Sequence, residues 1–188
     1  LAPYINRSGG HVIVFHMLTE GHAYAQLLDE RLAIVPGDVV IFPHGDSHTF
    51  ESDPCPDALD GEGELQRIFS QGLKLSRMGG GGEIARFVCG YMLCEPSLSQ
   101  VFLARLPSMF KVNIRQEQSG QWLENSIRYS FADTNANDAG GQAVLAKLSE
   151  ALFIETLRRY MSLLPAGQTG WLAGARDAEV GKVLALMH

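Results

Sequence analysis

The sequence has no apolar run long enough to cross a bilayer, which takes about 18 consecutive apolar residues. Its N-terminal stretch also lacks the basic start and the small-residue cleavage site of a secretory signal peptide. Both absences predict a cytoplasmic protein with no membrane partner. With 46% apolar residues, 188 residues suffice for the core of one compact domain, or of one domain with an appendage.

Basic residues are in the minority: 15 Lys and Arg stand against 21 Asp and Glu, and the formal net charge is −6. Proteins that bind nucleic acids normally carry a basic surface that displaces counterions from the phosphates. The chain by itself is therefore predicted not to bind DNA strongly, and no DNA-binding residue is assigned in it.

Cysteine is scarce, with only Cys55, Cys89 and Cys94. An odd number of cysteines in a chain without a secretion signal argues against a disulfide framework. Thiol chemistry and metal binding stay open for these residues.

Short β-rich runs separated by turn residues fill the first half of the chain. Strands are predicted at residues 12–18, 23–28, 32–35, 39–42, 65–69 and 84–93. Two stretches rich in Gly, Asp and Pro, residues 52–63 and 79–82, are predicted to be loops. Many short strands favour a barrel or a sandwich.

The apolar spacing becomes helical after Pro96. Helices are predicted for residues 98–106, for the segment from Ser119 to Phe131, for residues 142–164, and from Asp177 to the last residue. Ser119 is a candidate cap of the second helix, in which Leu123, Ile127 and Phe131 form one stripe.

The third helix has an apolar stripe that is too broad for a single partner, formed by Leu145, Leu148, Leu152, Ile154, Leu157, Met161 and Leu164. It is expected to pack on the barrel and on a second subunit, although burial within its own monomer fits the stripe equally well. The last helix has nothing to pack against, which is typical of a domain whose remainder has been cut off.

The most specific pattern is Pro-Gly-Asp-Val-Val-Ile-Phe-Pro-His-Gly-Asp-Ser-His, residues 36–48. It begins with a tight turn at Gly37, continues as a buried strand, and turns again at Pro43 and Gly45. This geometry predicts that His48 faces the interior of a barrel.

The spacing of Gly37, Pro43, Gly45 and His48 resembles the second sequence motif of the cupin superfamily. The first cupin motif is matched only in part: Gly10 and His16 fit, but Leu18 stands where cupin enzymes carry a second histidine, and Glu20 is merely near the carboxylate position. This departure argues against a catalytic metal centre, since metal-dependent cupins generally use three or four ligands.

The wider sequence is similar to the cupin subfamily that forms the ligand-binding domain of bacterial AraC-type transcription regulators. The matching stretches are residues 15–21, 36–48, 88–94, 106–107, 157–160 and 184–188.

The resemblance implies an α+β fold, in which an N-terminal cupin-like β-barrel (a double-stranded β-helix) is followed by a helical C-terminal part. The implied organisation is a sensor barrel over residues 1–95, a helical dimerisation and packing region over 96–170, and over 171–188 a linker with the first helix of a truncated helix-turn-helix domain. The implied partners are a small-molecule effector, a second copy of the chain, and DNA bound through a C-terminal domain that is absent here.

Four residues suggest a structural zinc site: His44 and His48 in the motif, with Cys89 and Cys94 further along. Residues five apart on a regular strand point to opposite faces, so the two cysteines converge only if Gly90 forms a bulge or if Cys94 lies beyond the strand end. The alternative is that Cys89 packs as a small core residue and that His44 is a solvated turn residue.

His16 is predicted to line the barrel cavity with His48 and Tyr24, where they would offer polar groups and a stacking surface to a small ligand. The alternative is a core histidine with an internal hydrogen-bond partner.

Three functions compete. The first is a ligand-sensing regulatory domain, which is not an enzyme. The second is a stand-alone cupin oxygenase or isomerase in which His16, Glu20 and His48 hold iron or manganese. The third is a dimerisation module without ligand, acting through Leu157 and its stripe.

Overall fold

The computed structural model describes residues 10–51, 63, 77, 83–95, 103–104, 106–132 and 140–164. Its main elements are β1 (His11–Glu20), β2 (Ala23–Leu27), β3 (Glu30–Ile34), β4 (Asp38–Phe42), β5 (Thr49–Glu51), β6 (Arg86–Cys94), β7 (Phe110–Asn113), α4 (Gln118–Ala132) and α5 (Gly141–Leu163). The predicted strand at 65–69, the loop at 79–82, most of the predicted helix at 98–106 and all of residues 171–188 lie outside the described residues.

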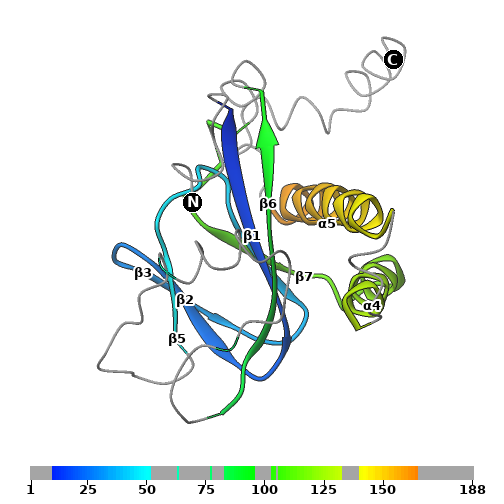
Figure 1. Cartoon of the computed structure of the whole chain (residues 1–188). Helices are drawn as coiled ribbons and strands as arrows, with labels where there is room; N and C mark the ends of the chain where they lie inside the picture. Colours follow the sequence, from blue (N-terminus) through cyan, green and yellow to red (C-terminus); the bar gives the residue numbers. More distant parts are fainter. Residues whose placement is uncertain are drawn as a thin grey trace.

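The strands form two antiparallel sheets, one in the order β6-β1-β4-β7 and the other in the order β3-β2-β5 (Figure 1). β1 is central because it pairs with β4 on one side and with β6 on the other. The pairing of β1 with β6 runs without interruption from His11 opposite Cys94 to Leu18 opposite Phe87. The strands predicted from the sequence match β1, β2, β3, β4 and β6 to within a few residues, whereas β5 and β7 were not predicted.

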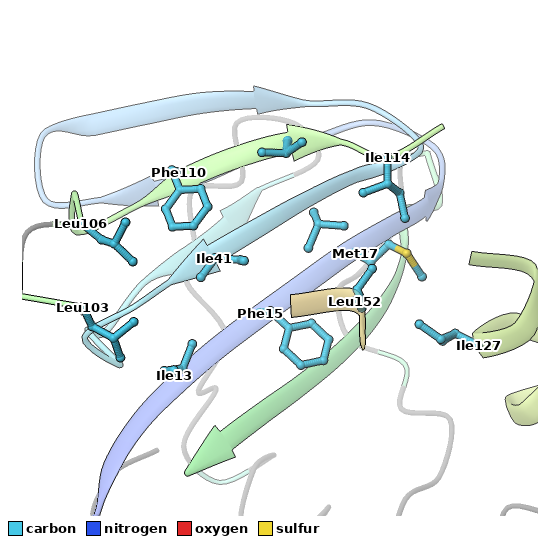
Figure 2. Close-up of a cluster of buried hydrophobic side chains, with 12 residues drawn as sticks. Ile13, Phe15, Met17, Ile41, Leu103, Leu106, Phe110, Ile114, Ile127 and Leu152 are labelled. Carbon is cyan, nitrogen blue, oxygen red and sulfur yellow. The ribbon is translucent and has the colours of Figure 1, made fainter. Parts of the chain in front are cut away.

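β1 is apolar on both faces because each face contributes to a different core. Val12, Val14 and Leu18 belong to a cluster between the two sheets, which also includes residues of β2, β3 and β4. The alternate residues Phe15 and Met17 belong to a second cluster on the other face of the sheet, which the helices cover (Figure 2). A strand that is buried on both faces has a nearly continuous apolar sequence, as β1 has.

The helices α4 and α5 lie side by side against the four-stranded sheet (Figure 1). Ile127 of α4 and Leu152 of α5 reach the core next to Phe15, with 2% and 0% of their surface exposed (Figure 2). The predicted stripes are wrong at Phe131 and Ile154, which are 42% and 64% exposed, because these residues fall on helix surfaces that neither the sheet nor the other helix covers.

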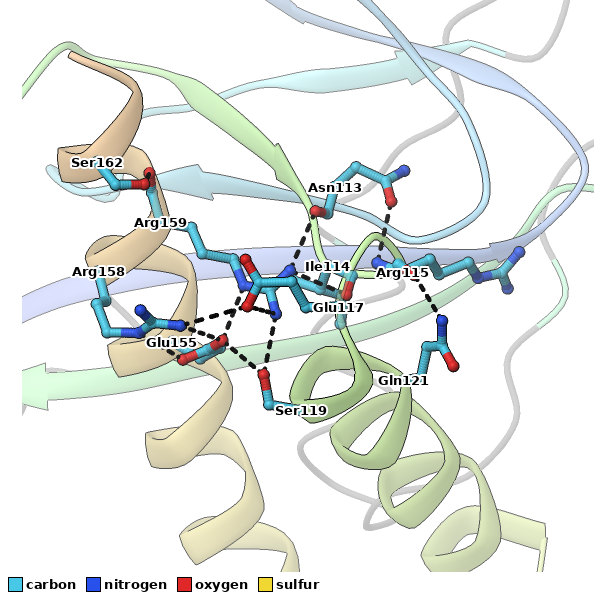
Figure 3. A network of polar contacts seen from close by, with 10 residues as sticks. All are labelled: Asn113, Ile114, Arg115, Glu117, Ser119, Gln121, Glu155, Arg158, Arg159 and Ser162. Carbon is cyan, nitrogen blue, oxygen red and sulfur yellow. Dashed lines mark hydrogen bonds and ion pairs between the residues drawn. The ribbon is translucent and has the colours of Figure 1, made fainter.

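A network of polar contacts joins both helices to the end of β7 (Figure 3). The guanidinium of Arg159, on α5, donates to the backbone carbonyl of Ile114 at 3.0 Å and to Glu155 at 2.8 Å. It also donates to the hydroxyl of Ser119 at 3.1 Å. Ser119 lies inside the first turn of α4 and joins this network through its side chain, so its predicted role as the helix cap is wrong.

The α+β class is confirmed, with two facing antiparallel sheets and two helices. Closure of the sheets into a barrel stays a prediction. None of the helices in the described ranges has the length and apolarity needed to cross a membrane.

Candidate functional site: a histidine and cysteine cluster between the sheets

His16 projects from the middle of β1 into the space between the sheets. It has the same strand parity as Val14 and Leu18, which pack in the inter-sheet core. Its Nδ1 lies 2.9 Å from Sγ of Cys89, its register partner on β6, and its Nε2 lies 2.8 Å from Nε2 of His48. Cys89, His16 and His48 are called the His16 cluster below.

The motif turn positions His48. Gly45 has φ +67° and its Cα approaches β1 so closely that a Cβ would lie 2.8 Å from the carbonyl oxygen of Val12, which explains the glycine. The chain then returns so that the ring of His48 stacks on Phe42, with centroids 3.6 Å apart and planes 9° from parallel. Nδ1 of His48 lies 2.8 Å from the backbone carbonyl of Asp46.

These contacts define where the protons sit. A carbonyl only accepts, so Nδ1 of His48 carries a hydrogen and donates to Asp46. In a neutral ring Nε2 of His48 is then an acceptor, and Nε2 of His16 donates to it. Nδ1 of His16 is left as the acceptor of the Cys89 thiol. The cluster is a chain of hydrogen bonds in one direction, from Cys89 to His16 to His48 to Asp46.

The surroundings keep the side chains of the His16 cluster uncharged. Burial, and to a lesser degree the neighbouring His48, lowers the pKa of His16 to about 3. Burial is also the main reason why the pKa of His48 is lowered. Burial raises the pKa of the Cys89 thiol to about 12, although Cys89 keeps solvent-accessible surface.

Aromatic rings form the walls around the cluster. The Phe50 ring, on β5, lies edge-on to His16 at 4.7 Å between centroids, and Phe87, on β6, lies 4.9 Å from Phe50. Further along the same face of β6, Tyr91 and Leu93 are 42% and 54% exposed. The face of β6 that carries Cys89 is therefore apolar and partly open.

The other predicted zinc ligands lie elsewhere. The β1–β6 register is regular across Gly90, so the expected bulge is absent and Cys94 is on the opposite face of β6 from Cys89, packed against the helix-side core. Gly90 instead makes room for Phe15, since a Cβ there would lie 2.2 Å from the Phe15 ring. Nε2 of His44 lies 3.1 Å from the carbonyl oxygen of Leu106. The structure brings His48 and Cys89 together around His16, and does not bring His44 or Cys94 to them.

Tyr24 does not join His16. It alternates on β2 with Ala23 and Ala25, which face the inter-sheet core, and so it faces away from that core. The Arg31 guanidinium lies over the Tyr24 ring, 3.9 Å from the centroid. This cation–π contact accounts for Tyr24 on the outer face of the smaller sheet.

The cupin-enzyme set of His16, Glu20 and His48 does not come together either. Glu20 lies at the end of β1, where its carboxylate is 2.8 Å from Arg86 and 3.5 Å from Arg128. No group of three or more His, Cys, Asp and Glu residues in the described ranges could hold one metal ion. The described residues therefore do not fit the metal centre of a cupin enzyme, and the zinc ion stays a prediction of the sequence.

Sequence analysis missed Phe42 and Phe50 as the rings that pack on the histidines, and it missed the contact between His16 and Cys89. The strand that ends at Phe42 is buried on both faces, so no alternation in the sequence shows which way Phe42 points. The contact with Cys89 depends on a strand register between residues 73 positions apart.

Comparison with known proteins identifies the family. Residues 3–162 match the family model described as Cupin, so the chain belongs to the cupin family. A Streptomyces lividans protein named as an AraC-like transcription regulator is 23% identical over 181 residues. The match includes 94% of this chain and 57% of the Streptomyces protein, so the chain spans little more than half the length of that relative.

Proposed function

We propose that this chain is the ligand-sensing domain of an AraC-type transcription regulator, with its effector bound between the sheets beside His16. In this proposal DNA is bound by a further domain outside the 188 residues, and the chain is not an enzyme. The family match and the name of the Streptomyces relative support the regulatory class.

The observation that carries the proposal is that the strand holding His16 is also attached to the helices. At the end of β1 the backbone carbonyl of Thr19 accepts a hydrogen bond of 2.9 Å from Arg115, whose guanidinium also pairs with Glu124 of α4. Glu20 lies 3.5 Å from Arg128 of α4. A ligand that shifts β1 would thus act on α4 through direct contacts, as a coupling between two sites requires.

The test is a reporter in which residues 1–188 are fused to a DNA-binding domain that represses only as a dimer. The expected result is that at least one compound in a metabolite panel changes repression by wild type, and that His16→Leu loses the response while the protein level is unchanged. A response that persists in His16→Leu, or no response to any compound, would count against the sensor function.

We also propose that the chain pairs with a second copy through the α4–α5 face, defined as Trp122, Tyr129, Val144 and Ile154. These side chains are 54–71% exposed. Trp122 lines two shallow hollows between the helices, so the face offers both a projecting ring and places to receive one. A surface that carries both is suited to a two-fold interface. This face replaces Leu157 as the proposed contact, since Leu157 packs against the chain's own core.

Sedimentation equilibrium would test the pairing. Trp122→Glu is expected to convert a dimer into a monomer, because a charge would be buried without a partner. The control is Leu28→Glu, which adds the same charge at a side chain that is 85% exposed in the β2–β3 turn. Equal dimer content in both variants, or a monomeric wild type, would refute this interface.

A further inference from the structure

We infer that the site beside the His16 cluster takes an uncharged aromatic or largely apolar small molecule, and not an anion, a cation or a polyol. The inference rests on the proposed sensor function for the existence of an effector, and adds its chemical class. Three observations support it: the hydrogen bonds within the His16 cluster, the charges on the inter-sheet surface, and the aromatic residues around the cluster.

The polar atoms of the cluster are already used by one another. Both nitrogens of His16 are engaged, by Cys89 at 2.9 Å and by His48 at 2.8 Å. Both nitrogens of His48 are engaged, by His16 and by the carbonyl of Asp46 at 2.8 Å. A polyol or carboxylate that bound these nitrogens would have to break one of these hydrogen bonds, and the displaced partner would then have to find another.

Among the described residues, the charged side chains with the strand parity of the inter-sheet surface are Asp38, Lys111 and Glu30, and Glu30 is exposed at the start of β3. The carboxylate of Asp46 is exposed in the motif turn next to His48. Asp38 and Lys111 lie on the β4–β7 side and pair with each other at 2.9 Å. Arg31 and Glu51 are on the outer face of the smaller sheet, where they lie 3.4 Å apart. An ion brought between the sheets would lose its hydration, and the described strand residues around the His16 cluster offer it no opposite charge, which is unfavourable.

The remaining surface consists of aromatic rings and a polarizable sulfur. Phe50 and Phe87 lie against each other at 4.9 Å, and Cys89 presents a thiol whose hydrogen is already donated to His16. Sulfur and ring edges both pack well against an aromatic ring. The partly exposed side chains of Tyr91 and Leu93 extend this surface along β6, so a flat apolar molecule would cover area that is otherwise in water.

Three probes of nearly the same shape separate the possibilities: 1-naphthalenemethanol, 1-naphthoate and 1-naphthylmethylammonium. Binding of each to the whole chain is measured at pH 7 from probe fluorescence. The neutral probe is expected to bind at least 10-fold more tightly than either ion. Equal or tighter binding of an ion would overturn the inference.

A variant shows whether this preference belongs to the site. Cys89→Lys places a cation on the partly accessible face of β6 and is expected to shift the preference towards 1-naphthoate by 10-fold or more. Leu28→Lys adds the same charge in the exposed β2–β3 turn and is expected to leave the ratio unchanged. A ratio that does not move with Cys89→Lys, or that moves equally with Leu28→Lys, would refute the proposed site.

The two proposals fail separately. Neutral-probe binding that responds to Cys89→Lys, together with a silent reporter, would retain the ligand class and remove the regulatory function. A reporter that responds only to ionic compounds would retain the function and overturn the ligand class.

Discussion

Two neighbouring arginines on α5 share Glu155 and differ in burial, which makes them a matched pair for testing what attaches this helix. The Arg159 side chain is 7% exposed and Arg158 is 58% exposed. Arg159 also donates to the carbonyl of Ile114, a residue with no exposed surface, whereas Arg158 has only carboxylate partners among the contacts described. We therefore expect Arg159→Ala to destabilise the fold far more than Arg158→Ala.

The magnitude follows from the partners that are lost. Arg159→Ala deprives a buried carbonyl of its donor, at a cost of about 1–3 kcal/mol, and removes the buried aliphatic stem of the side chain. Glu155 keeps Arg158, so the cost stays below the 3–5 kcal/mol typical of breaking a buried pair, and we expect about 2 kcal/mol. Arg158→Ala removes a solvent-screened pair of an exposed side chain and should cost much less than Arg159→Ala.

Urea unfolding at pH 7, followed by far-UV circular dichroism, gives the free energy of unfolding of each variant. The cost of Arg159→Ala should also change little between low and high salt, because its largest component is a hydrogen bond to a buried carbonyl. Equal costs for the two variants, or a larger cost for Arg158→Ala, would refute the assignment of Arg159 as the attachment of α5.

Three further predictions concern pH, packing and metal. Arg158, then Arg159 and Ser119, lower the pKa of Glu155 to about 2 from 4.5. The resulting stability, about 1–2 kcal/mol after allowance for screening near the surface, should be complete above pH 4.5 and lost as the pH falls towards 2, and acid titration of Glu155→Gln should lack this loss. Gly90→Ala should cost about 1–3 kcal/mol in thermal unfolding because its Cβ would overlap the buried Phe15 ring, and an unchanged melting temperature would contradict the close packing. Elemental analysis tests the zinc prediction: zinc near one per polypeptide, lost in Cys89→Ser, would support it, and no zinc would leave the hydrogen bonds from Cys89 to Asp46 as the resting state.

Local patterns were enough to predict the motif segment and the fold class. Gly37, Pro43 and Gly45 constrain their own turns, and the apolar run between them is a strand in any compact fold, so the spacing that led to the cupin prediction could be read directly from residues 36–48. The change from strand to helix periodicity after residue 96 likewise depends on neighbours in the chain.

The composition of the site was decided by contacts between distant segments. Cys89 lies beside His16, and Cys94 points away, only because of the register between β1 and β6, which no local pattern reports. Tyr24 and Ile154 were predicted on the wrong faces for the same reason. Alternation along a strand or a stripe along a helix shows which residues share a face, but tertiary packing decides whether that face is covered. The sequence by itself therefore determined most of the described elements and the family of this protein. The tertiary structure decided which side chains meet between its sheets, because that meeting depends on how strands far apart in the chain are paired.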